Sequence, residues 1–229
     1  WQMSDVSAGL LSAFQYADSF FPTGSTSLSN GLEALVDDGV VGDGDDLEKF
    51  VQGQIRWRWE PFERPFVVHA IRQCTRLQDL LSLDNLLHAQ SLSAEAREGS
   101  IRTGRALLRM HVGLATRGAV DYQRLISDQI AKGHNAVMQG LVWGRSGLPE
   151  EQAELISAHT FCVTYLGAAI RLGVVGHQSA QGILTRLHRE VADQVRKPCS
   201  DVDAVTSFCP EQEIGMMRHE KLSTRLFLN

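Results

Sequence analysis

The sequence predicts an all-α fold, a single helical-bundle domain of roughly eight to ten helices. Apolar residues recur at the three-to-four-residue spacing of an amphipathic helix through most of the chain. No segment alternates apolar and polar residues as a half-buried strand does, and no internal repeat or low-complexity linker interrupts the pattern. We expect one domain over residues 1–229, with a core over about residues 5–197 and a C-terminal tail over residues 198–229.

The composition indicates a globular protein with an acidic surface. Of the 229 residues, 43% are hydrophobic, and 27 Asp and Glu outnumber 22 Lys and Arg, for a formal net charge of −5. This balance argues against nucleic-acid and anionic-membrane partners, because both require a basic face. No apolar run approaches the roughly 20 residues that span a bilayer, and no signal peptide is recognisable, so we expect a cytoplasmic location.

The first expected helix ends at a turn that is rich in Gly, Pro and hydroxyl residues. Pro22 fixes its own φ and favours an extended Phe21, so the helix should end before this point. Gly24 can then adopt a backbone conformation that other residues avoid. The helix has one apolar face, formed by Leu10, Leu11, Phe14 and Ala17.

A short helix is predicted after this turn. The run Asn30-Gly31-Leu32-Glu33 reads as a capping box with Asn30 as the N-cap. From the residues alone, the alternative interpretation is an ordinary loop that starts a helix.

The next expected helix contains Trp57 and Trp59 and should end at Pro61. Residues two positions apart on a helix point in nearly opposite directions, so the two rings cannot form one base-stacking surface. We therefore expect one Trp in the core and one near the surface, where it is a candidate anchor for a protein partner. Pro65 suits the first turn of the following helix.

Further helices are predicted by the same spacing. The longest begins after Ser93, a good N-cap, and its inner stripe contains small residues that let another helix approach closely. His111 lies on its apolar side and is interpreted as a core histidine. The other predicted helices cover about residues 66–74, 80–88, 125–130, 136–141, 155–169 and 184–195, the last ending at Pro198.

The sequence shows no recognisable catalytic or metal motif, so we expect neither an enzyme nor a bound cofactor. Glu-x-x-His, nucleophile-elbow, dinucleotide-binding and Walker patterns are all missing, and His219-Glu220 lacks the second His of a zinc-protease motif. The four cysteines form no Cys-x-x-Cys pair and read as buried free thiols. Cys199, Cys209 and His219 match the spacing of no known closed metal site.

The tail is unusually apolar for a chain end. It contains Phe208 and Met216 and finishes with Leu226-Phe227-Leu228, whereas chain ends are normally polar and disposable. Such a segment must either dock on its own domain or be ordered by a partner. The residues alone leave both alternatives open.

Two stretches resemble the signatures of the urease accessory protein UreF family. Residues 18–33 resemble the opening signature, in which a Pro-x-Gly turn leads into a Gly-Leu-Glu helix start. The matching residues are Pro22, Gly24, Gly31, Leu32 and Glu33. Arg218-His219-Glu220 and Arg225-Leu226-Phe227 resemble the closing signature. The segment between the two stretches is predicted to be helical, so the resemblance extends over nearly the whole chain.

The resemblance implies a non-catalytic, dimeric, all-α cytosolic chaperone for urease maturation. Such a protein bridges the scaffold protein UreD (also called UreH) and the GTPase UreG, which carries nickel, to apo-urease. Carried over residue by residue, the closing signature implies partner-binding roles for Arg218, His219, Glu220, Arg225, Leu226 and Phe227. Because the expected core helices end before Pro198, we expect removal of residues 225–229 to leave the domain folded.

The chain departs from the family pattern at Thr26, Leu28 and Ser223, where many members have an aromatic residue, a polar residue and a tyrosine respectively. These departures affect the expected dimer strength and choice of partner.

Two other functions stay open at this stage. One is an enzyme with an unrecognised site in a helical bundle. The other is a regulator of GTP hydrolysis in which Arg225 acts as an arginine finger supplied in trans.

Overall fold

A computed structural model of the chain describes residues 2–219 and 225–228, the side chains of residues 2–8 excepted. Every regular element within these residues is helical, which confirms the all-α prediction. The α-helices are α1 (Gln2–Ala17), α2 (Leu32–Asp37), α3 (Gly44–Gln54), α4 (Arg64–Arg72), α5 (Leu77–Gln90), α6 (Ala94–Gly113), α7 (Ala119–Ser127), α8 (Asn135–Arg145), α9 (Glu150–Arg171), α10 (His177–Val195) and α11 (Pro210–His219). Two short 3₁₀ turns, η1 (Ser25–Ser27) and η3 (Val202–Ala204), and a π-helical segment, η2 (Ile55–Glu63), connect them.

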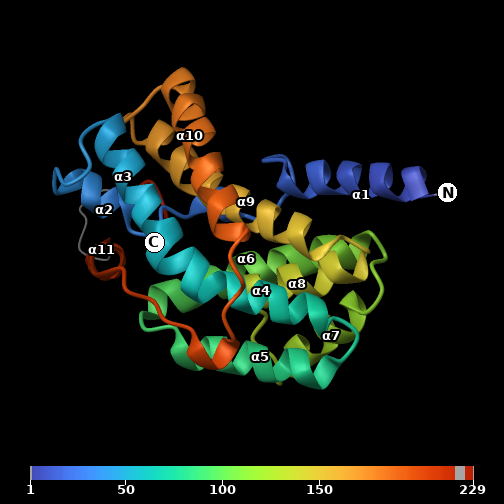
Figure 1. Cartoon of the computed structure of the whole chain (residues 1–229). Coiled ribbons are helices and arrows are strands. Elements are labelled where there is room, and N and C mark those ends of the chain that lie inside the picture. Colours follow the sequence, from blue (N-terminus) through green and yellow to red (C-terminus); the bar gives the residue numbers. More distant parts are fainter. Residues whose placement is uncertain (1, 220–224, 229) are drawn as a thin grey trace.

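Helix α9 is shared by two clusters of buried apolar side chains. Its first half contributes Ala153 and Ile156 to a first cluster with α4, α5, α6, α7 and α8. Its second half contributes Cys162 and Tyr165 to a second cluster with α2, α3, η2 and α10. Figure 1 shows α9 running between these two groups of helices. The helix is apolar around most of its circumference because it packs on both sides.

Helix α9 is also the one helix, among those searched in the described residues, that is long and apolar enough to cross a membrane. More than half of its apolar stretch is buried inside the structure, as in the core helix of a globular protein.

Small residues let helices of the first cluster approach closely, as the sequence predicts for the long helix. A Cβ added at Gly104 of α6 would lie 2.3 Å from the Gly133 carbonyl oxygen. A Cβ at Gly140 of α8 would lie 2.4 Å from the Ala70 Cβ of α4. These contacts place α8 directly against α4 and α6.

The prediction that a helix ends at Pro61 is wrong. The chain stays helical from α3 through η2 into α4, with Pro61 inside the π-helical segment. A π turn bonds each N–H one residue further back than an α turn, and such wider turns accommodate a local break in the α-helical ladder. Trp59 of this segment is fully buried and Trp57 is exposed, which confirms that one Trp is in the core and one at the surface.

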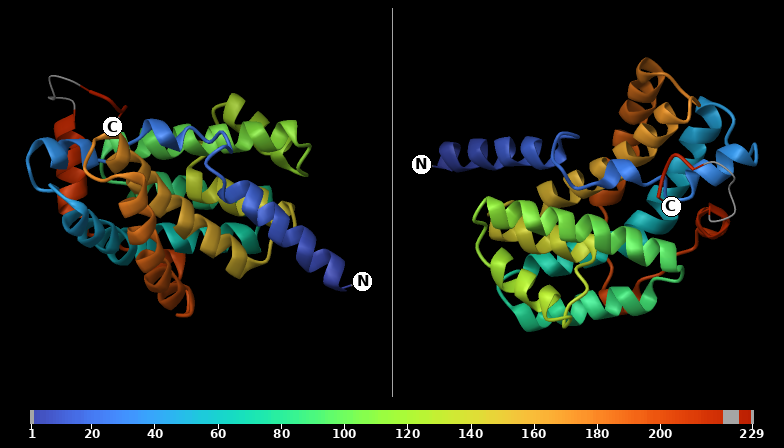
Figure 2. Two further views of the ribbon diagram at one scale, coloured as in Figure 1. Left: turned by 90° about the horizontal axis from the view of Figure 1, so that it is seen from above. Right: turned by 180° about the vertical axis from the view of Figure 1, so that it is seen from behind.

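The apolar face predicted for the first helix exists but is exposed to solvent. Leu11 and Phe14 are 68% and 63% exposed and Leu10 is also exposed, whereas Ala17, the fourth residue of the predicted face, packs against the first cluster beside the buried Ala13 and Tyr16. The reason is geometric: α1 extends beyond the rest of the molecule, so only its last turns lie against α9 (Figures 1 and 2).

A buried arginine joins α4 to the end of α10. Arg64 is 2% exposed and its Nε donates to Glu154 of α9 at 2.5 Å. Its other nitrogens donate to the carbonyl oxygens of Gln194, Val195 and Lys197, which are orphan acceptors at a helix C-terminus. Burial raises the pKa of the Glu154 carboxyl, while the Arg64 guanidinium opposes that shift.

The tail docks on the chain's own helices, which decides between the two alternatives that the sequence leaves open. The Thr206 N–H donates to the Pro61 carbonyl oxygen and the Phe208 N–H donates to the Trp57 carbonyl oxygen, both at 3.1 Å. Helix α11 then packs against α2, so residues far apart in sequence lie side by side (Figures 1 and 2).

Candidate functional site

The two signatures lie together where α2 meets α11. A Cβ added at Gly31 would lie 2.6 Å from the Gln212 carbonyl oxygen, and one added at Gly215 would lie 2.8 Å from the Gly31 carbonyl oxygen. The two backbones therefore touch without intervening side chains. Gly31 also has φ +84°, a conformation that favours glycine, so two separate constraints select glycine at this position.

The turn before α2 places one aromatic side chain in the core and leaves its proline outside. Phe21 is buried against Tyr16 and His111, with ring centroids 5.6 and 5.7 Å apart. Pro22 is exposed, and Gly24 has φ +73° at the start of η1. The Pro-x-Gly pair thus shapes the backbone of the loop that runs toward α2.

Glu33 is the centre of the site. Its side chain is 7% exposed and accepts three hydrogen bonds: from His219 Nε2 at 2.7 Å, from the Leu226 N–H at 2.6 Å and from the Phe227 N–H at 3.2 Å. The capping-box prediction for this helix is wrong. The N-cap is Gly31, without a side-chain cap bond, and the Glu33 carboxylate is occupied by the C-terminal signature instead.

The residues just before the end of α11 hold that helix against α2. Arg218 forms a bidentate pair with Asp38, at 2.5 and 2.9 Å, on the exposed side of the contact. His219 is 3% exposed and reaches Glu33 on the buried side. Glu220 and Ser223 lie outside the described residues.

The last described residues return to the N-terminal turn. Phe227 is 4% exposed within the second cluster, and the Arg171 guanidinium carbon lies 4.3 Å from its ring centroid. Arg171 also donates to the carbonyl oxygen of Thr26, and the Leu228 N–H donates to that of Ser27 at 3.0 Å. Two of the three positions that depart from the family pattern are described. Thr26 is exposed and contacts Arg171 through its backbone carbonyl oxygen, whereas Leu28 is buried.

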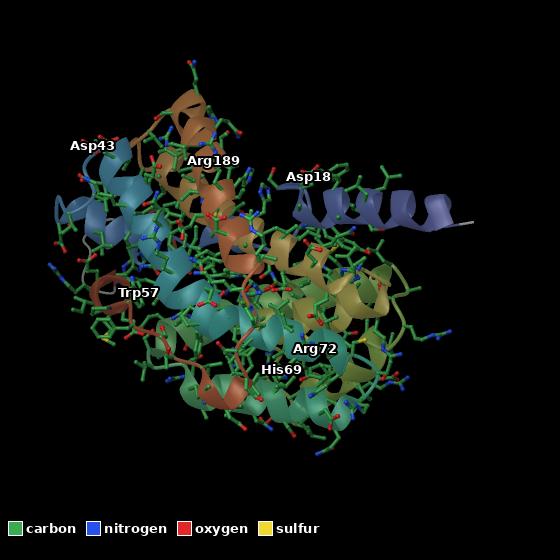
Figure 3. The ribbon with its side chains drawn as sticks, in the orientation of Figure 1. Asp18, Asp43, Trp57, His69, Arg72 and Arg189 are labelled. Carbon is green, nitrogen blue, oxygen red and sulfur yellow. The ribbon has the colours of Figure 1, made fainter. Side chains whose placement is uncertain are left out.

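Neighbouring residues of the C-terminal signature point in opposite directions. Phe227 faces the interior, whereas Arg225 is exposed and Leu226 is 60% exposed. Other apolar side chains are exposed along the same segment and beside it, as Figure 3 shows for Trp57. We call this set the tail surface: Trp57, Phe208, Ile214, Met217, Leu226 and Leu228. Exposed apolar surface is typical of protein-binding sites, so these side chains are the candidate docking residues.

A cavity of about 330 Å³ lies beneath the N-terminal turn and α11. Tyr165 accepts a 2.7 Å hydrogen bond from Gln212 Nε2, and Ser157 donates to Gln139 at 3.0 Å. Within the described residues, Trp143 Nε1 and Gln212 Oε1 have no hydrogen-bond partner. Burial raises the pKa of Tyr165 well above its usual value, so its hydroxyl stays protonated and cannot act as a base at neutral pH.

The three residues considered for a soft metal have different neighbours. Cys199 lies near Arg64 and Cys209 near Arg58, whereas His219 is bonded to Glu33. Burial raises the pKa of each thiol to about 11, so neither is a thiolate near neutral pH. In the described part of the chain, no group of three or more His, Cys, Asp or Glu side chains is placed to hold a metal ion.

Sequence reasoning missed the residues that act across long separations. Asp84 is fully buried and accepts the N–H groups of Lys132, Gly133 and His134, at 2.7 to 2.8 Å, which fixes the turn into α8. Arg171 joins the N-terminal turn to Phe227. The sequence signal for such residues is a charged side chain within an otherwise apolar helical face. That signal does not identify the residue to which the side chain bonds.

The amino-acid sequence is similar to those of known proteins over nearly its whole length. The family model UreF matches residues 41–188. A Trichodesmium erythraeum (strain IMS101) chain named urease accessory protein UreF is 33% identical, with 99% of both chains covered. A chain of the same name from Bacillus sp. (strain TB-90) is 30% identical, over 96% of this chain and 99% of the relative. One from Paenarthrobacter aurescens (strain TC1) is also 30% identical, over 94% and 96%.

Proposed function

Because this chain belongs to the UreF family of urease accessory proteins, we propose that it is a cytoplasmic adaptor that assembles with the scaffold UreD (UreH) and the GTPase UreG to deliver nickel to apo-urease. It is not an enzyme, since its relatives are named as accessory proteins. The observation that carries the proposal is the joining of both family signatures at Glu33, next to the exposed tail surface.

The site has the form of a binding surface on a rigid support. Phe227 and His219 are anchored inside, which fixes the backbone of residues 225–228 without a partner. Leu226 and Leu228 then present apolar area outward, and Arg225 adds a planar charged group that suits a carboxylate or phosphate. An apolar anchor beside an arginine is the usual composition of an interface hot spot.

We also propose that the chain forms a homodimer through a second surface. The exposed apolar stripe of α1 lies away from α11 and the tail surface (Figure 2), so both surfaces can be occupied at once. Leu10, Leu11 and Phe14 would lose solvent contact against a second copy, which favours association by about 25 cal/mol for each Å² of apolar area buried.

The proposal is tested by two substitutions one residue apart. Leu226→Asp places a charge on the tail surface and should abolish capture of the purified UreD–UreG pair, with the urea unfolding midpoint nearly unchanged. Phe227→Ala should lower the free energy of unfolding by about 3 kcal/mol, because it removes a buried ring. The control is Ile130→Asp, an exposed position shortly after α7, a helix that Figure 1 shows far from α11; this variant should bind normally.

Full capture by folded Leu226→Asp would mean that the tail surface is not the docking site. Loss of capture by Ile130→Asp as well would show that the assay reports general surface charge.

A further inference from the structure

Two pairs of histidines face each other across helices. Nδ1 of His159 in α9 lies 3.1 Å from Nε2 of His188 in α10. Nδ1 of His88 in α5 lies 3.1 Å from Nε2 of His134, the N-cap of α8. Spacing along the sequence does not reveal either pair, because their members are 29 and 46 residues apart.

The separation of 3.1 Å suits two nitrogens that share one metal ion. Imidazole nitrogens bound to a cation at about 2.0–2.1 Å lie about 2.9 Å apart at a right angle and about 3.4 Å apart at the tetrahedral angle. Without a cation, one nitrogen of each pair must carry a proton that it donates to the other. Each pair is therefore either a structural N–H···N bond or the two-nitrogen half of a metal site.

The surroundings identify the His88–His134 pair as structural. His134 is fully buried, and its Nδ1 lies 3.1 Å from Ser100 Oγ, which fixes the ring from the other side. Burial lowers the pKa of His134 to about 4. Lys132 and Arg97 contribute positive charge at His88, against the single negative charge of Asp84, and so oppose the binding of a cation.

The His159–His188 pair has a more open setting. His188 is exposed and His159 is partly buried, and the hydrogen bond between them is exposed to solvent. On α10, His188 comes directly before Arg189, which is labelled in Figure 3.

We propose that His159 and His188 form a surface binding site for a late first-row divalent cation, bridging α9 to α10. The ring centroids are 5.4 Å apart and the nitrogens 3.1 Å apart, so the two nitrogens face each other nearly head-on. Binding requires a rotation of the rings about χ2, a soft torsion for histidine. The exposed position of His188 leaves room for that rotation.

The ligand set defines which ions bind and how firmly. Two imidazoles favour Cu²⁺, Ni²⁺ and Zn²⁺ over the hard cations Mg²⁺ and Ca²⁺, which require oxygen ligands. Water fills the remaining positions, so the ion exchanges readily, unlike one in a closed four-ligand site. This departs from the expectation of no metal-binding residues, which rested on sequence spacing. The inference does not depend on the proposed adaptor function.

The test is calorimetric titration of tag-free protein at pH 7.5 with CuCl₂, NiCl₂, ZnCl₂ and, as a negative control, MgCl₂. We expect one equivalent of Cu²⁺ to bind most tightly, weaker binding of Ni²⁺ and Zn²⁺, and none of Mg²⁺. Because the ion would join two helices only in the folded state, Zn²⁺ should also raise the thermal midpoint.

His159→Ala and His188→Gln should each remove this equivalent and the thermal shift, with the far-UV circular dichroism unchanged. His88→Ala breaks the other pair and should retain both effects. The proposal is wrong if the wild-type protein binds no stoichiometric ion at millimolar metal. It is equally wrong if folded His188→Gln binds Cu²⁺ as the wild type does, because the ligands then lie elsewhere, for example at the exposed His177.

Discussion

At the scale of single residues, one carboxylate, that of Glu33, joins the start of α2 to the C-terminal signature. The Glu33 carboxylate accepts hydrogen bonds from three donors that water would satisfy in the unfolded chain. Two of them are backbone N–H groups, which need an acceptor once they are removed from water. A sequence can identify Glu33 as part of a helix start. It cannot identify its partners, because they lie up to 194 positions away.

We expect Glu33→Ala to lower the free energy of unfolding by about 3 kcal/mol, since it leaves buried donors unpaired. Glu33→Gln keeps one acceptor oxygen and the shape of the side chain, so it should cost less. Urea unfolding followed by circular dichroism measures both. Equal stability of Glu33→Ala and the wild type would show that the tail is held by its apolar contacts alone.

A second residue-scale prediction concerns acid. Burial lowers the pKa of His111 from 6.5 to about 4, so the unfolded chain takes up a proton in a pH range where the folded chain does not. His111 therefore contributes its full stability above pH 6.5 and loses it progressively as the pH falls toward 4. His134, whose pKa burial also lowers to about 4, adds a second proton in the same window.

The urea midpoint should accordingly fall between pH 7 and pH 5. His88 and His159, whose pKa burial also lowers, act in the same direction, and His111→Gln removes one of these protons and should flatten the slope. A slope identical to that of the wild type would mean that His111 is already protonated in the folded protein.

At the scale of elements, prediction succeeded where the signal is local. Helical spacing and turn residues located most helices, and the positions of Trp57 and Trp59 followed from their separation by two. It failed where tertiary contacts override a local rule. The π-helical turn absorbs Pro61, Glu33 bonds to the tail instead of capping α2, and α1 extends beyond the body so that its apolar face is exposed.

The contact between α2 and α11 gives an element-scale prediction. In Gly215→Ala the new Cβ would lie 2.8 Å from the Gly31 carbonyl oxygen, so α11 must shift away from α2, at a cost of about 1–3 kcal/mol. Gly53→Ala in α3 is the matched control, because a Cβ there meets nothing within 4 Å. It should stabilise the helix by up to about 1 kcal/mol.

Thermal unfolding measures both variants, and capture of the UreD–UreG pair shows whether the shift reaches the tail surface. If Gly215→Ala were as stable as Gly53→Ala, the backbones would not be as close as described.

At the scale of the whole molecule, the tail belongs to the folded body. The expectation that residues 225–229 can be removed without loss of fold conflicts with the burial of Phe227 in the second cluster, beneath Arg171. That expectation placed the end of the core just before Pro198, shortly after α10 ends at Val195. Nothing local in the tail shows that α11 packs against a helix formed by residues 32–37.

The proposed dimer is the prediction for this scale. Light scattering at tens of micromolar, a range that populates moderate interfaces, should give twice the chain mass for the wild type. Leu11→Asp combined with Phe14→Asp should give a monomer with unchanged helix content, because both side chains are already exposed. A dimer that survives this double substitution would have to use another surface.

The bond between Glu33 and Leu226 spans 193 positions, and this separation affects how the protein is made. A ribosome releases residue 33 long before residue 226, and closing so long a loop carries an entropic cost that local helices do not have. The donors that complete the Glu33 contact exist only after Leu226 and Phe227 have emerged from the ribosome. A nascent chain that has not yet reached residue 226 can therefore form helices but cannot assemble this contact.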